Sequence, residues 1–250
     1  DRRQQPIGDL PSDQYDFDGE LMRSFLIVLS IFVGLPLLVK LGWSLAYPTY
    51  DFQRTLTIEV MTPDGPVKSV NTARLLYTQG PSFGFVDGAS GSWKNFGEAP
   101  VVDLGNGQYL FALFDSSTSV VFDAAEYADF LDTGDRWRDV RKIDRARGVV
   151  WDVPIDIMPD LITFRDQSDF TSAMIVDPTN LAETVGPGFE LVGMKVEVTN
   201  EPTTSGLILP LLSEWAEDGM PGFKILPENS RIYLSLNHTS FWSATPRIQD

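Results

Sequence analysis

The sequence predicts a single N-terminal transmembrane helix followed by an α+β domain, which is built mostly from antiparallel sheet with a few short helices. Two observations carry this prediction. An uncharged apolar segment runs from Ser24 to Val39, and the segments after it alternate between apolar and polar residues, which is the period of half-buried strands. We divide the chain into an acidic polar tail over 1–23, a transmembrane helix over 24–47 and the α+β domain over 48–250.

The uncharged run is short for a membrane span but has a plausible extension. Its sixteen residues reach about 24 Å as a helix, against roughly 30 Å of hydrocarbon, and continuing to Tyr47 closes the gap. Lys40 can extend its amine to the membrane surface, and aromatic side chains with a polar edge prefer the headgroup boundary. We therefore predict four membrane-interface residues, which are Lys40, Trp43, Tyr47 and Tyr50.

Two other interpretations of this segment remain. A cleaved signal peptide is one, because Ser44-Leu45-Ala46 loosely resembles a small-x-small cleavage site. A buried core helix is the other, although a helix that is apolar on every face would need a large domain around it. Positive charges near the segment favour a cytoplasmic N-terminus by a narrow margin, with Arg2, Arg3 and Arg23 before it against Lys40 and Arg54 after it.

The first half of the domain begins with a half-buried strand. From Thr55 to Met61, Leu56, Ile58 and Val60 share one face. A turn at 63–65 and a returning strand over 67–77 follow, and then a long loop over 79–97 that is rich in Gly, Ser and aromatic residues. The dipeptide Asn106-Gly107 between two apolar runs predicts a hairpin over 101–114 with a type I′ turn.

The second half combines short helices and strands. We predict a helix over 123–131 with Asp123 as its cap, and a helix over 135–147 that buries Trp137, Val140 and Ile143 and stops at Gly148. A strand over 161–164, one or two helical turns between Pro178 and Gly186, and strands over 189–200 and 232–236 complete the domain.

Three segments of the domain resemble a widespread, functionally uncharacterised family of small membrane-anchored proteobacterial proteins. They read TIEVMTPDG at 57–65, EAPVVDLG…LFALF at 98–114 and DLITFRDQSD…IVDPTNLAETVGPGFE…VEVTNEP at 160–202, of which 177–188 is the most specific part. The resemblance extends over roughly 55–215. It implies a Gram-negative bacterial origin and a membrane anchor, and it carries no catalytic residue to this chain.

Composition excludes several kinds of chemistry. The chain has no Cys, so disulfides and Cys-ligated metals are excluded, and its net charge of −16 argues against a nucleic-acid partner. The single histidine, His238, has no Gly-x-Ser-x-Gly motif to serve, and we interpret it as a surface or turn residue. The acidic residues of the tail do not fit the spacing of a calcium loop. We predict no catalytic residue, no metal site and no cofactor.

One cluster of basic residues stands out in this acidic domain. Residues 48–250 hold fifteen basic residues against 29 acidic ones, a net charge of −14. Six of the fifteen fall within twelve positions, namely Arg136, Arg138, Arg141, Lys142, Arg145 and Arg147. They form a candidate contact for a partner protein or for lipid. The competing interpretation is a solvated helix face whose charges pair with the acidic residues of 123–135.

Together these observations favour a single-pass accessory or scaffold subunit of a larger membrane protein complex. We expect it in the bacterial inner membrane, with the N-terminus cytoplasmic and the domain periplasmic. Its predicted partners are other membrane-protein subunits and the lipid bilayer, without nucleic acid, and they would bind the tail, the transmembrane helix and the domain. The alternative is a membrane-tethered periplasmic hydrolase or ligand-binding protein that uses the aromatic loop from Phe83 to Trp93.

Overall fold

The computed structural model describes two separate units, an N-terminal helix and a domain that begins at Thr49. The described residues are 13–80, 91–114, 119–132, 136–212, 223–225, 234–236 and 238–241. Helix α1 runs from Asp13 to Ala46. It therefore begins within the stretch that the sequence assigns to a polar tail, because acidic residues are compatible with the first turns of a helix.

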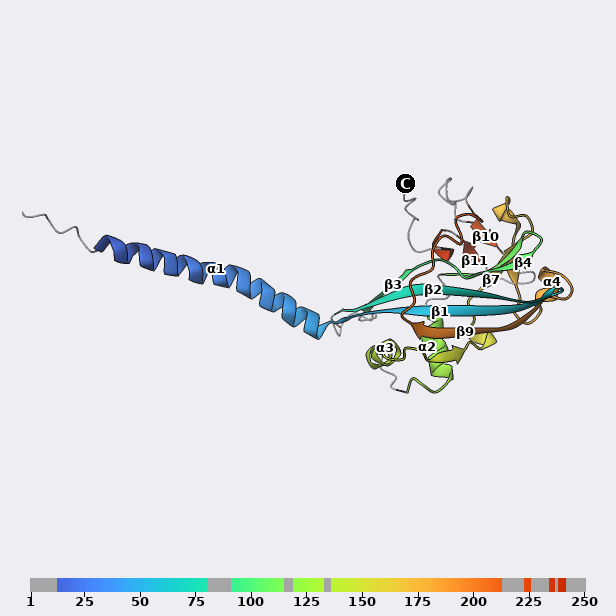
Figure 1. The fold of residues 1–250 in the computed structure, drawn as a ribbon, viewed down its shortest axis with the longest axis horizontal. Helices are drawn as coiled ribbons and strands as arrows, with labels where there is room; N and C mark the ends of the chain where they lie inside the picture. The colour runs from blue at the N-terminus through green and yellow to red at the C-terminus, as the bar shows by residue number, and fades with distance from the viewer. Residues whose placement is uncertain are drawn as a thin grey trace, which may run out of the picture. The chain divides into compact units, whose positions relative to one another are not determined.

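The domain contains a five-stranded antiparallel sheet in the order β3-β2-β1-β9-β6. Its long strands are β1 (Thr49–Thr62), β2 (Gly65–Gln79) and β9 (Glu190–Thr199), and they run side by side in Figure 1. The short outer strands are β3 (Gly91–Phe96) and β6 (Val150–Asp152). The predicted loop over 79–97 is therefore wrong for β3, and residues 81–90 lie outside the described residues.

A second sheet has four antiparallel strands in the order β4-β5-β7-β8. The strands are β4 (Val101–Gly105), β5 (Gln108–Ala112), β7 (Leu161–Phe164) and β8 (Ala173–Val176). Both residues of the Asn106-Gly107 turn have positive φ, at 53° and 76°, as a type I′ turn requires. The predicted hairpin and the predicted strand over 161–164 are thus confirmed.

Short helices pack around the two sheets. They are α2 (Val120–Tyr127), α3 (Arg136–Asp144) and α4 (Leu181–Thr184), with 3₁₀ turns at Ile155–Ile157, Phe170–Ser172 and His238–Ser240. Asp123 does not cap α2 as predicted. The helix starts three residues earlier, after Ser119, because Val120 and Val121 are apolar and enter the core.

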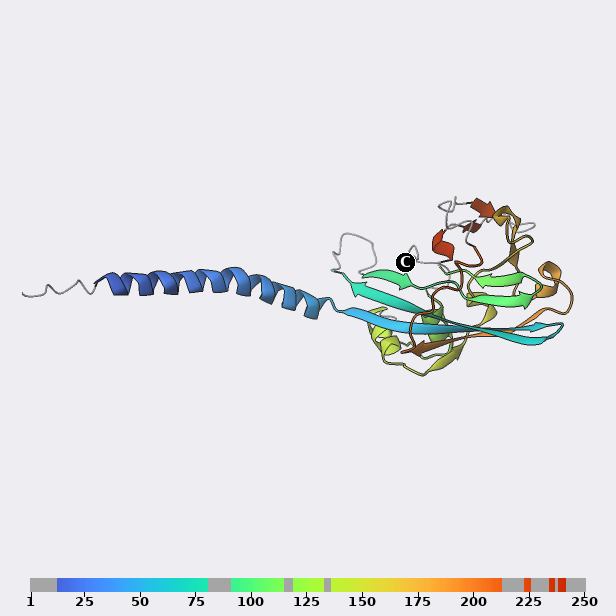
Figure 2. The same cartoon turned by 45° about the horizontal axis from the view of Figure 1, so that its top comes forward.

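Alternation along each strand builds two layers of core. Phe52, Leu56 and Ile58 of β1 face the same side as the buried residues of β9, and α2, α3 and one face of the second sheet cover them. The other face of the second sheet carries Phe111 and Ile162 and packs against C-terminal segments. Figure 2 shows the β4–β5 hairpin, in green, between the long blue strands and the red C-terminal strands β10 (Phe223–Ile225) and β11 (Leu234–Leu236).

The C-terminal segments that cover the second sheet form a third layer of the domain. The chain after β9 connects this third layer to the two sheets. It crosses to the outer edge of β2, where Thr204 donates its N–H to the carbonyl of Thr72 (2.8 Å) and its hydroxyl accepts the N–H of Thr72 (2.9 Å). It then reaches the carboxylate of Glu98, which accepts hydrogen bonds from the N–H groups of Gly206, Leu207 and Ile208 at 2.7–3.2 Å. Glu98 is only 5% exposed, so these backbone groups satisfy a buried charge.

Candidate membrane and partner surfaces

Helix α1 contains one segment that is long and apolar enough to cross a membrane. The segment covers Met22–Ala46, and its 25 residues reach about 37 Å, more than the roughly 30 Å of a hydrocarbon core. None of its apolar window is buried within the protein. The hydroxyls of Ser30 and Ser44 donate to the carbonyls of Ile27 and Leu41, which satisfies these polar groups inside the helix. Among the described residues this is the single candidate span, and its exposure disfavours a buried core helix.

The predicted interface residues separate into two groups. Lys40 is exposed, and the Trp43 and Tyr47 rings pack together at the end of α1 with centroids 4.7 Å apart. Tyr50 instead lies in β1 and packs against the core of the domain. Tyr50 lies two residues before the buried Phe52, so alternation along β1 predicts that both side chains point to the same face. The run of aromatic residues at the end of α1 concealed this signal.

The predicted basic cluster lies on and just after α3, and two of its residues, Lys142 and Arg147, form ion pairs with nearby acidic residues. Lys142 binds the Asp132 carboxylate at 2.5 Å and lowers the pKa of that carboxyl, and Arg147 contacts Asp144 at 3.2 Å. These two bonds support the interpretation of a helix face paired with neighbouring acids. The side chains of Arg138, Arg141 and Arg145 are exposed, and that of Arg136 lies outside the described residues.

Basic residues also contact the first residues of the domain. Arg141 Nε donates to the hydroxyl of Tyr50 at 3.2 Å, which joins α3 to the start of β1. Sequence spacing gave no signal for this contact, because the two residues are 91 positions apart.

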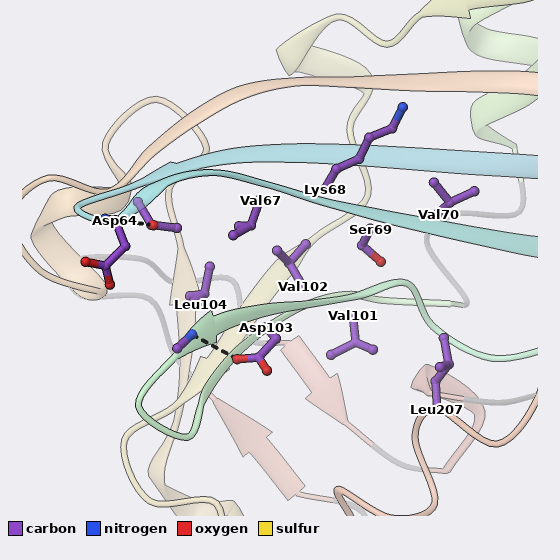
Figure 3. A pocket seen from close by; sticks show the side chains of 12 residues that line it. Asp64, Val67, Lys68, Ser69, Val70, Val101, Val102, Asp103, Leu104 and Leu207 are labelled. Carbon is purple, nitrogen blue, oxygen red and sulfur yellow. Dashed lines mark hydrogen bonds between the residues drawn. The ribbon is translucent and has the colours of Figure 1, made fainter.

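A groove of about 670 Å³ lies between β2 and β4 (Figure 3). Val67 of β2 and Val102 and Leu104 of β4 point into the space between the strands. Two carboxylates line it, but Asp103 accepts the N–H of Gly105 at 2.8 Å and so closes its own turn. The groove is therefore mainly an apolar gap beside a strand rather than a site of converging acids.

On the edge of β2 that borders this groove, the outward backbone groups of Lys68 and Val70 form no hydrogen bond with the described part of the chain. Because the backbone groups of Thr72 point outward to Thr204, those of Val70 and Lys68, two and four residues earlier, point the same way. Among the described strands, β2 pairs over this stretch only with β1. An extended segment of another chain can add here as a strand, since the donor and acceptor spacing already matches one.

The structure relocates one residue of the alternative ligand-binding loop. Trp93 lies in β3 and packs against Tyr77 and Phe122 with centroids 4.4 Å and 4.9 Å away. The rest of that loop, over 81–90, and the side chain of His238 lie outside the described residues. Within the described part of the chain no three His, Asp or Glu side chains gather as a metal site would require.

Sequence reasoning missed the most deeply buried charge among the described residues of the domain. Arg54, counted above as a charge flanking the membrane segment, points into the core from β1 and is 1% exposed. Burial lowers the pKa of its guanidinium to about 10, so it remains charged at neutral pH. Arg54 lies two residues from both Phe52 and Leu56, so alternation along β1 places all three side chains on the same face. That spacing was the signal in the sequence for the burial of Arg54.

Comparison with models of protein families, with curated proteins and with solved structures finds no match to this chain. The surfaces described above therefore carry the functional argument.

Proposed function

We propose that this protein is a single-pass accessory or scaffold subunit of a larger bacterial membrane complex. The observation that carries the proposal is the apolar span of α1, exposed along its length and joined to a domain with its own core. An apolar helix of this length that buries nothing within its own protein is stabilised by lipid or by neighbouring membrane helices. The resemblance to proteobacterial anchored proteins supports a bacterial origin.

The proposed location is the inner membrane, with the N-terminus in the cytoplasm and the domain in the periplasm. The narrow excess of positive charge before the apolar segment, Arg2, Arg3 and Arg23 against Lys40 and Arg54 after it, supports this orientation. The native chain contains no Cys, so a single introduced cysteine reports on one position. In intact cells an A182C variant should react with a membrane-impermeant maleimide, because Ala182 is exposed on α4. Labelling only after the inner membrane is permeabilised would reverse the orientation.

The proposed binding site for a partner protein is the open edge of β2. A V70P variant removes the outward N–H of Val70 and places a ring where an added strand would lie, while the pairing of β2 with β1 keeps its hydrogen bonds. V70T retains the N–H and is the matched control. Both variants of the full chain are purified in mild detergent, and co-purifying proteins are identified by mass spectrometry.

The scaffold proposal predicts that defined membrane proteins accompany the wild-type chain and V70T but are lost from V70P. If nothing accompanies the wild-type chain beyond the background of an unrelated single-pass protein, the subunit proposal is wrong. If the same proteins accompany all three chains, binding does not use the edge of β2.

A further inference from the structure

Strand β4, like β2, has an open edge beside the groove. The N–H of Ala112 donates to the carbonyl of Pro100 at 3.0 Å, so these two groups point toward each other between β5 and the start of β4. Backbone groups alternate in direction along an antiparallel strand, so Val102 bonds toward β5, whereas Val101 and Asp103 turn their N–H and C=O groups to the opposite edge. Among the described strands β4 pairs only with β5, and both outward residues line the groove.

The open edges of β2 and β4 belong to different sheets but border the same groove (Figure 3). Its volume of about 670 Å³ lies within the roughly 300–1,000 Å³ of typical ligand sites. An extended chain carries donors and acceptors on both of its edges, so a strand that enters the groove can bond to β2 with one edge and to β4 with the other. The side chains of Val67 and Val102 offer such a strand apolar contacts.

The groove is negatively charged at one end. Asp64 precedes β2 and Asp103 lies near the end of β4, and both exposed carboxylates lie at the same end of the groove (Figure 3). Lys68 also lines the groove, but its side chain points away from β4, and it lies directly opposite Glu59 in the pairing of β1 with β2. Among the described residues that line the groove, no other basic side chain offsets the two carboxylates. A basic residue of a bound segment would complement this end.

We infer that the groove binds an extended segment of a partner protein, which hydrogen-bonds to both β2 and β4 and carries a basic residue beside Asp64 and Asp103. The inference rests on the proposed role of the β2 edge as a partner site. From Asp64 to Val70 the β2 side of the groove covers about 20 Å in strand geometry, which corresponds to a segment of about six residues. Apolar side chains at alternate positions of the segment face Val67. The side chains between them lie beside the exposed Val70, where threonine and other β-branched residues suit a strand.

The test measures the binding of short labelled peptides to the full chain in detergent by fluorescence anisotropy. The reference peptide alternates valine with threonine and carries an arginine at each end, so that either strand direction brings one arginine to the acidic end. A second peptide has glutamate in place of each arginine. Two further peptides carry N-methyl groups on all valines or on all threonines, which removes the donors from one edge of the strand or from the other.

We expect the reference peptide to bind the wild-type chain and V70T. Its affinity should fall about tenfold or more with either set of N-methyl groups, and likewise in V70P, because each change removes hydrogen bonds and adds a steric obstacle. The loss with both methylated peptides is the specific signature of bonding to two edges.

The charge of the segment is tested separately. The glutamate peptide should bind the wild-type chain about tenfold more weakly than the reference peptide. D64K should weaken binding of the arginine peptide about fivefold and strengthen that of the glutamate peptide by a similar factor, a gain that misfolding does not produce. E126K is the matched control, because Glu126 is exposed on α2 and does not line the groove, and it should change neither affinity by more than about twofold.

Several outcomes would overturn the inference. Equal affinity for the arginine and glutamate peptides, or equal effects of D64K and E126K, would refute the basic residue, and a loss with only one methylated peptide would refute bonding to β4. Self-association of the wild-type chain that V70P abolishes would assign the groove to a second copy. If V70P loses its co-purifying proteins but no peptide binds the wild-type chain, only the chemistry of the segment is wrong; if V70P keeps them, the proposed partner site on β2 is itself wrong.

Discussion

Glu98 provides the sharpest test of how the third layer of the domain is held. Its Oε1 accepts the N–H of Gly206 at 2.8 Å, and its Oε2 accepts those of Leu207 and Ile208 at 2.7 and 3.2 Å. In an E98Q variant only one oxygen remains to accept hydrogen bonds from these backbone N–H groups. The new NH2 group takes the place of the other oxygen, and because it is a donor it cannot accept from the N–H group that it faces.

The expected cost of E98Q follows from these three bonds. A hydrogen bond to a charged group contributes about 1.5–3 kcal/mol, and the substitution loses one bond outright and removes the charge from the others. The burial of Glu98 limits replacement by water. We therefore expect the free energy of unfolding to fall by about 2–4 kcal/mol.

The assay is urea unfolding of the full chain in detergent, followed through the intrinsic fluorescence of its six tryptophans, which include the buried Trp151. For a domain of this size, with an m-value of about 3 kcal/mol/M, the midpoint should fall by about 1 M. E126Q is the control, because Glu126 is exposed on α2 and its substitution should cost less than about 0.5 kcal/mol. Hydrogen exchange should accelerate at the amides of 206–208. Equal midpoints for E98Q and E126Q would refute the proposed fastening role.

Four further substitutions test other features of the fold. Arg74 donates to Asp51 and lowers the pKa of that carboxyl, so their pair stabilises the fold above the unfolded pKa of about 3.9 and ceases to do so as pH falls through the lowered value. D51N should therefore cost about 0.5 kcal/mol at pH 7, after solvent screening, and progressively less as the pH of the urea titration is lowered below about 3.9. I143A empties a fully buried site under α3 and should cost about 2–5 kcal/mol, lowering the Tm measured by calorimetry by about 6–15 °C, and a normal Tm would contradict the packing of that helix. G107A places a side chain at φ 76° and should cost about 1 kcal/mol by urea unfolding, whereas an unchanged midpoint would argue against the turn. I31R charges the centre of the span at a cost of about 2.5–3.5 kcal/mol and should move the chain into the carbonate-soluble fraction, while retention in the pellet would count against a span here.

Features set by neighbouring residues were predictable from the sequence. The turn chemistry of Asn106-Gly107 specified a hairpin, and alternation around Met194 identified both the strand β9 and its buried face. Spacing also predicted the buried side of α3, where Val140 and Ile143 enter the core. In each case the signal spans only a few residues, which is the range over which backbone geometry couples neighbours.

Features set by distant segments were not predictable. β3 has little alternation of its own and exists as a strand because it pairs with β2. The ligands of Glu98 lie 108–110 residues away and are backbone groups, so no side-chain pattern identifies them. The contact between α3 and the start of β1 likewise depends on topology, because Arg141 and Tyr50 are 91 positions apart in the sequence.

The pairing of β1 with β9 has a consequence for biosynthesis. The first strand is complete at Thr62, but the strand that covers its second edge begins only at Glu190, about 130 residues later. At 5–20 residues per second, that edge waits roughly 6–26 s for its partner after it is made. During that interval the β1–β2 hairpin is a partly finished sheet with an apolar face, the kind of intermediate that pairs wrongly with other chains. The order of the strands thus makes the nascent chain dependent on being shielded until its last third has emerged.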